Sequence, residues 1–278
     1  MKYVVIVIAT LCLGVVTLFS LNSPKPAIAD TNPVEGSGTS PATEANATQA
    51  TIADAILAHY TFDAADGAVV HDHAVYNNGV ANGKYWRSAG IRNNALVLED
   101  GQVEIANQPQ LNHDLSPFSI STWVQLRPDS SIWIDKRDFQ NRPKTVEGRQ
   151  GGTFDHYVPL AGYSLWVSEH ATDGTFINLF VNQMGIEFNA NAHFPAGQSL
   201  ANGQWHHVVA TVTPGQAGGL VLYVNGAAVA WADTTSLTQP YNSTSPMYIY
   251  GRGQAGVDET ALFGDALSAE QVAELFNE

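Results

Sequence analysis

Short runs of β-branched and aromatic residues, separated by turn signals, constrain the fold of this chain more than any other feature. In the run 119–126, Ile120, Val124 and Leu126 share one parity, so a strand would bring them to one face. Further runs of this kind cover residues 163–167, 176–182, 205–212, 220–225 and 247–250. Asn225-Gly226 lies between two apolar runs and tolerates the positive φ of a tight hairpin. Many short strands without helices between them predict an all-β sandwich.

The end of the chain carries the signature of a short helix. Ser268 can cap its first turn, and Gln271 completes the spacing of a capping box. Val272, Leu275 and Phe276 then form an apolar stripe at helical spacing. We therefore expect one short C-terminal helix after the strands.

The start of the chain is typical of an exported protein. A positive N-terminus, an apolar run over residues 3–21 and an A-x-A pattern at 27–29 predict a secretory signal peptide over residues 1–29. An uncleaved membrane anchor is the alternative, because about 20 apolar residues are enough to span a bilayer. In either case the protein is expected to be secreted or held at the cell surface.

Residues 30–50 contain hardly any bulky apolar side chain, so they are predicted to be a flexible linker to a domain over residues 51–278. The only cysteine, Cys12, falls within the predicted signal, so the mature domain must be stable through its core. The formal net charge is −14, and loss of Lys2 and Lys25 with the signal would make it −16. This acidity argues against nucleic acid or an anionic membrane surface as a partner, and it fits a soluble extracellular protein or one that binds cations.

A set of sequence markers occurs in order along residues 56–278. They are Tyr60-Thr61-Phe62-Asp63, Asn77-Asn78-Gly79, the stretches 118–124, 203–210 and 222–226, Gly256-Val257-Asp258-Glu259, and the stretch 266–272. In this order they resemble the laminin-G-like domains of the concanavalin A-like lectin and glucanase superfamily. The resemblance implies a two-sheet antiparallel jelly roll, with one convex and one concave sheet, and a role in glycan binding or extracellular adhesion.

The resemblance also implies a structural calcium ion (Ca2+), which needs several hard oxygen ligands. The matching positions are Asp63 at the first strand, the turn Asn78-Gly79, and Asp258 near the last strand, with Asp72 as a further possible ligand. The alternative is that Asp63 and Asp258 form a turn and accept hydrogen bonds that close the two ends of the domain.

A glycan site would combine aromatic faces, which stack on the C–H patches of sugars, with polar groups that pair with hydroxyls. The densest mixture of this kind comprises Trp133, Asp135, Arg137, Tyr163, Trp166, Asn178 and Asn182. The resemblance implies that these segments line the concave sheet and its rim, where the polar insert 136–160 could form a wall. The alternative is that half of these residues pack in the core.

The sequence lacks the catalytic signatures of this superfamily. The E-x-D-x-E strand of the β-glucanases is absent, and so are the Arg-rich and Gln-x-His strands of the alginate lyases. A pair of carboxyls about 5 Å apart could still come from Glu169, Glu187 and Asp155 on separate strands. Successive strand residues point to opposite faces, so His206 and His207 cannot bind one metal ion together. Both are therefore predicted to be structural.

The leading prediction is therefore a non-catalytic extracellular binding module whose partner is a glycan or polysaccharide. The alternatives are an adhesion module that binds an extracellular protein, and a hydrolase or lyase of the same fold.

Overall fold

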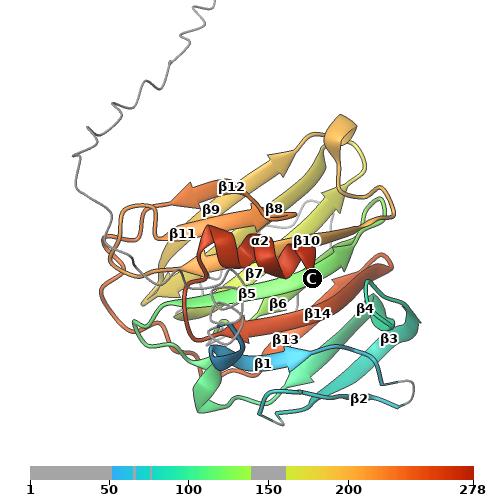
Figure 1. The fold of residues 1–278 in the computed structure, drawn as a ribbon, viewed down its shortest axis with the longest axis horizontal. Helices are drawn as coiled ribbons and strands as arrows, with labels where there is room; N and C mark the ends of the chain where they lie inside the picture. The colour runs from blue at the N-terminus through green and yellow to red at the C-terminus, as the bar shows by residue number, and fades with distance from the viewer. Residues whose placement is uncertain (1–51, 65–66, 76, 139–160) are drawn as a thin grey trace, which may run out of the picture. The chain divides into compact units, whose positions relative to one another are not determined.

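The computed structural model describes residues 52–64, 67–75, 77–138 and 161–278, and strands dominate them (Figure 1). The strands are β1 (Ile56–Tyr60), β2 (Val69–Val70), β3 (Gly79–Ala89), β4 (Asn94–Ile105), β5 (Phe118–Gln125), β6 (Ser131–Asp135), β7 (Ala161–His170), β8 (Gly174–Gln183), β9 (Ile186–Phe194), β10 (Trp205–Val212), β11 (Leu220–Val224), β12 (Ala227–Ala232), β13 (Met247–Arg252) and β14 (Ala255–Phe263). The 3-10 helices η1 (Pro109–Leu111) and η2 (Ala196–Gln198) and the α-helix α2 (Ala269–Asn277) lie between or after them.

Three sequence predictions concern segments that fall wholly or mostly outside these residues. They are the signal peptide, the linker and the insert 136–160, of which only the first three residues are described. No helix within the described ranges is long and apolar enough to cross a membrane.

Antiparallel hydrogen bonding joins most of the described strands into one path, in the order β12-β11-β10-β5-β14-β4-β13-β6-β7-β8-β9. Off this path, β1 pairs with β14, and β3 pairs with β4 and β2. Strand β4 connects two layers, because its residues 96–98 pair with β14 whereas residues 101–105 pair with β13. The path folds over, so that β9 at one end lies against β11 and β12 near the other. The all-β prediction is confirmed as an antiparallel sandwich that approaches a barrel.

The core lies between the two layers and follows the alternation of the sequence. On β5, Ile120 and Val124 are fully buried, and they belong to the same core cluster as Leu165 and Val167 of β7 in the other layer. Removal of these side chains from water is the main force that holds the layers together. The parity predicted for the run 119–126 is therefore confirmed, and the intervening positions project to the outer faces.

Two local predictions are confirmed at the level of hydrogen bonds and dihedral angles. Ser268 Oγ accepts from Gln271 N, and Gln271 Oε1 accepts from Ser268 N, which completes the capping box of α2. Asn225 and Gly226 have φ of +50° and +79°, and they join β11 to β12 as a tight hairpin.

Helix α2 covers the outer face of one layer (Figure 1). Its buried Val272 joins a second apolar cluster that includes Val209 of β10, Tyr223 of β11 and Phe263 of β14. On the other layer, β6, β7, β8 and β9 carry half-buried or exposed aromatic and amide side chains on their outer face.

Candidate functional site

A row of aromatic and amide side chains crosses five neighbouring strands on this second outer face. Directly paired residues of antiparallel strands project to the same side of a sheet. The register pairs each member with the next across β13, β6, β7, β8 and β9. We call this set the cross-strand row, and its members are Tyr250, Trp133, Trp166, Asn178 and Asn191.

The rings of the cross-strand row contact one another in sequence. The centroids of Trp133 and Trp166 are 5.0 Å apart with planes inclined at 18°, and those of Trp133 and Tyr250 are 5.3 Å apart. Phe180, on the same side of β8, meets Trp166 edge-on at 4.9 Å. The indole Nε1 atoms of both tryptophans are buried and have no hydrogen-bond partner among the described residues. The row is thus an extended surface of aromatic rings, in which the two indole N–H groups are unpaired within the described ranges.

A charged pair is fixed at the edge of these rings. Arg137 Nε and Nη2 donate to the two carboxylate oxygens of Asp135 at 2.9 and 2.7 Å. This bidentate geometry is the strongest form of a charge-assisted hydrogen bond. The guanidinium carbon lies 4.9 Å from the ring centroid of Trp166 and 5.7 Å from that of Phe180. Asp135 and Arg137 therefore add oriented polar groups to an aromatic surface.

Strand β9 extends the polar side of the site, and the sequence interpretation missed it. Asn191 Nδ2 donates to Asn189 Oδ1 at 2.7 Å, and Asn189 Nδ2 donates to Glu187 Oε1 at 3.0 Å. All three side chains are exposed, whereas the alternating residues Phe188 and Ala190 are buried. The signal was present in the sequence, because residues 187–193 alternate polar and apolar side chains with the period of a strand.

Five of the seven predicted glycan-site residues come together on this face: Trp133, Asp135, Arg137, Trp166 and Asn178. Tyr163 does not, because its position has the opposite parity to Trp166 on β7 and its ring is buried in the core. Its hydroxyl donates to Leu111 O at 3.1 Å, and burial raises its pKa well above 10.

Asn182 is on the same side of β8 as Asn178 but four residues further along, which is roughly 13 Å in a strand. Its side chain is fully buried, and neither amide atom has a hydrogen-bond partner among the described residues. The structure therefore separates Asn182 from the cross-strand row.

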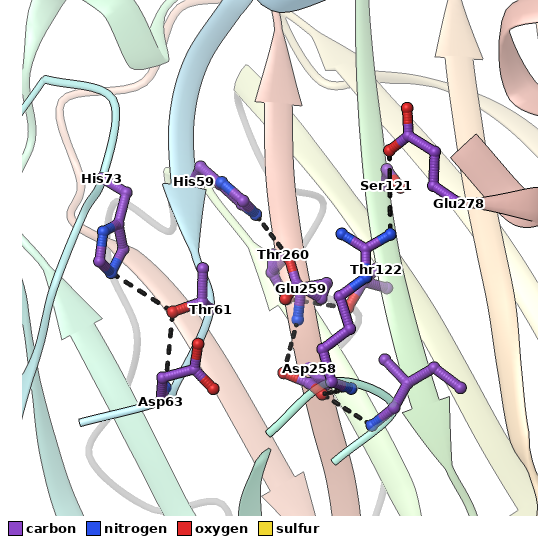
Figure 2. A network of polar contacts seen from close by, with 12 residues as sticks. His59, Thr61, Asp63, His73, Ser121, Thr122, Asp258, Glu259, Thr260 and Glu278 are labelled. Atoms are coloured by element: carbon purple, nitrogen blue, oxygen red, sulfur yellow. Dashed lines mark hydrogen bonds and ion pairs between the residues drawn. The ribbon is translucent and has the colours of Figure 1, made fainter. Parts of the chain in front are cut away.

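Two predicted calcium ligands accept hydrogen bonds at or next to the loop between β3 and β4, and Figure 2 shows those of Asp258. Asp63 Oδ1 accepts from Asn94 N at 3.1 Å, and Asp258 Oδ2 accepts from Ile91 N at 2.9 Å. Asp258 is fully buried, and this desolvation raises the pKa of its carboxyl to about 7. The two ends of the domain therefore meet at this loop through their carboxylates.

At the other predicted calcium positions, Asn78 and Asp72 hydrogen-bond within the protein, and Gly79 packs closely against β4. Asn78 Oδ1 accepts from Asp72 N at 2.9 Å. The carboxylate of Asp72 accepts four backbone N–H groups, those of residues 59, 74, 75 and 77. A Cβ at Gly79 would lie 2.5 Å from Val103 Cγ1, so glycine is needed there for close approach to β4. Across the described ranges, no group of three His, Cys, Asp or Glu side chains is arranged to hold a metal.

Glu169 and Glu187, the two described carboxylates that were considered for catalysis, do not form a pair. Glu169 is aligned with Thr175 of β8, and Glu187 is aligned with Asn182 of the same strand. Seven residues of β8 separate the two positions, or roughly 23 Å, whereas a retaining glycosidase needs about 5 Å. Glu169 is buried and accepts from the Thr175 hydroxyl, so it has a structural partner. Asp155 lies outside the described residues.

Solved structures of toxin binding domains share this fold. The binding domain of Paraclostridial Mosquitocidal Protein 1 has a TM-score of 0.60 and 15% identity, over 81% of this chain and 52% of that chain. The binding domain of botulinum neurotoxin DC with rat synaptotagmin II has 0.58 and 15%, with the same coverage. A botulinum neurotoxin type C structure, whose cell entry depends on two ganglioside molecules, has 0.58 and 14%, over 82% and 52%.

At these identities the likeness concerns the fold, and the chain spans about half the length of these structures. No curated protein matches the sequence. A laminin-G family model, described as the concanavalin A-like lectin/glucanases superfamily, matches residues 99–273. This match covers more than half of the chain and includes the cross-strand row. The chain therefore belongs to the concanavalin A-like lectin/glucanase superfamily.

Proposed function

We propose that this domain is a non-catalytic extracellular module that binds a saccharide chain along the cross-strand row. The observation that carries the proposal is the alignment of three aromatic rings and two amides across five adjacent strands. Sugar rings stack their C–H faces on aromatic side chains, and their hydroxyls pair with amides, carboxylates and guanidinium groups.

The dimensions of the row favour an oligosaccharide over a single sugar. Neighbouring strands are about 4.8 Å apart, so a row over five strands is roughly 19 Å long. The rings occupy the β13 end, and the amides of Asn178 and Asn191 occupy the β9 end. A chain of sugars crossing the strands would therefore stack at one end and hydrogen-bond at the other.

Adhesion to a protein is the second candidate function. Met184 and Ile186, at the turn between β8 and β9, are 76% and 57% exposed, and Trp231 of β12 is 72% exposed. Exposed apolar side chains of this size are common at protein interfaces. One of the similar toxin binding domains is a complex with synaptotagmin.

Two further features complete the proposal. The predicted signal peptide would deliver the domain to the outside of the cell, where glycans are the available partners. A calcium ion at the loop between β3 and β4 would lie near the carboxylates of Asp63 and Asp258 and would favour the ionised form of Asp258. Its role there would be to stabilise the fold.

A glycan and polysaccharide binding screen of the purified protein tests the proposal. A saccharide hit should be weakened at least tenfold by Trp166→Ala, because one stacking platform is lost. Trp231→Ala is the matched control, since this tryptophan is exposed and is not a member of the cross-strand row, and it should leave saccharide binding unchanged. Asn191→Ala, at an exposed position, gives a second variant that does not disturb ring packing.

Two results would contradict the proposal. One is a folded protein that binds no saccharide in the screen. The other is saccharide binding that Trp166→Ala and Asn191→Ala leave unchanged. Protein capture that depends on Trp231 or Met184, without saccharide binding, would favour the adhesion function.

A further inference from the structure

A pocket of about 300 Å3 lies beneath the end of α2, on the layer opposite the cross-strand row. It is bounded by β1, by α2 and by the outer faces of β5, β10 and β14. We call it the α2 pocket. The polar side chains that line it are His59, Arg92, Ser121, His207, Glu259 and Glu278.

The ionisable groups of the α2 pocket are paired with one another. His59 Nε2 lies 2.8 Å from Glu259 Oε2, and Arg92 Nη2 lies 3.8 Å from Glu278 Oε2 (Figure 2). A ligand that carries a net charge would have to compete with these internal partners. The charge pattern therefore favours a neutral ligand.

The floor of the α2 pocket contains an imidazole with unused hydrogen-bonding capacity. Ser121 Oγ and His207 Nε2 lie 2.8 Å apart. His207 is only 1% exposed, and its Nδ1 is buried without a hydrogen-bond partner among the described residues. Buried polar atoms are nearly always paired, so this nitrogen points to a partner from outside the protein.

Burial and the neighbouring Arg92 lower the pKa of His207 to about 4, so its ring is neutral at physiological pH. A neutral imidazole offers one donor and one acceptor nitrogen. A hydroxyl group can satisfy either of them.

The Ser121–His207 pair has the geometry of a nucleophile and its base, but hydrolysis does not follow from it. In serine hydrolases a carboxylate on Nδ1 orients the histidine, and here His207 Nδ1 has no such partner among the described residues. The chemistry left to the pair is hydrogen bonding.

The rest of the lining is apolar. Ile56, Phe263 and Leu275 form the walls, and Trp123 lies beside the Ser121–His207 pair. The Trp123 ring stacks on His207, with their centroids 4.9 Å apart. A fitting ligand needs an apolar face for these walls and at least one hydroxyl for the floor.

We propose that the α2 pocket binds one neutral sugar ring, through hydroxyl contacts with Ser121 and His207 and apolar contacts with Trp123 and the walls. A pyranose combines C–H faces with an edge of hydroxyls, and its size suits a cavity of about 300 Å3. This site is separate from the cross-strand row, because the core lies between the two layers. The protein would then hold two carbohydrate ligands on opposite faces.

The test uses methyl glycosides of neutral hexoses as probes, with saturation-transfer NMR and tryptophan fluorescence on the full chain. Ser121→Ala should weaken the binding of a positive glycoside about tenfold, which corresponds to the loss of one hydrogen bond. Ile56→Trp should abolish binding, because the larger side chain fills the α2 pocket. Ser168→Ala, on the opposite layer, is the matched control and should leave glycoside binding unchanged. Melting curves show which variants are folded.

Trp166→Ala separates this inference from the proposed function. Glycoside binding that survives Trp166→Ala but is lost in Ile56→Trp supports the α2 pocket, whatever happens at the cross-strand row. The inference is overturned if no glycoside binds to the folded protein, or if binding is lost in Trp166→Ala and kept in Ile56→Trp. Equal binding of 1,2-hexanediol, which has hydroxyls but no ring, would overturn the assignment to a sugar.

Discussion

The buried carboxyl of Asp258 should make the stability of this domain depend on pH, and Asp258→Asn should remove that contribution. Desolvation raises its pKa from 3.8 to about 7, although three backbone N–H groups donate to it. Because the folded protein holds this proton more tightly, the contribution is fully present below pH 3.8. It is lost progressively as the pH rises to 7. About three pKa units correspond to roughly 4 kcal/mol in the free energy of unfolding.

Two buried histidines act in the opposite direction over part of this range. Burial lowers the pKa of His113 and of His207 to about 4, so each resists protonation in the folded state. Their contribution is present above pH 6.5 and is lost as the pH falls towards 4. The wild-type pH profile therefore contains opposing terms, and the effect of Asp258 has to be measured as a difference.

Urea unfolding of the wild type and of Asp258→Asn, at several pH values from 4 to 8.5 in chelator, gives this difference directly. Loss of hydrogen bonds in the variant shifts its stability by a constant amount, so only the pH-dependent part is informative. The advantage of the wild type should fall by about 4 kcal/mol between pH 4 and pH 8. A difference that stays constant to within 1 kcal/mol across this range would refute the reasoning.

Two further predictions follow from the same structure. Millimolar calcium should raise the melting temperature at pH 8 relative to chelator, because a ligand of the native state stabilises it by mass action. Asp258→Asn should reduce this gain. Identical wild-type melting curves in calcium and in chelator would contradict the calcium proposal without affecting the pH prediction. Tyr163→Phe should lower the unfolding free energy by about 1 kcal/mol through loss of the bond to Leu111 O, and it should leave saccharide binding unchanged. Calorimetric titration with a saccharide hit measures the affinity of this variant. A large loss of affinity would mean that Tyr163 contributes to saccharide binding.

The sequence was informative about the outer face that carries the cross-strand row but not about which aromatic residues belong to it. Trp166 and Tyr163 stand three residues apart on β7, and both matched the composition of a sugar site. The parity of the strand sends one outward and the other into the core. Which parity is inward depends on where the second layer lies, and the residue types alone did not show this.

The local elements were determined by the sequence itself. The hairpin at Asn225-Gly226 and the capping box from Ser268 to Gln271 involve residues no more than three apart, so their conformations follow from local sterics and hydrogen bonding. The alternation of apolar residues along β5 likewise determined which side of that strand is buried.

Only the tertiary structure decided the contacts between distant segments. Asp258 reaches Ile91 across 167 positions, and Ser121 reaches His207 across 86. The predicted structural role of His207 did not anticipate the α2 pocket, because the pocket exists only where β1, α2 and three strands meet. Such contacts depend on the order in which strands pair within the sheet. A sequence shows that order only weakly, since many pairings would bury the same apolar faces equally well.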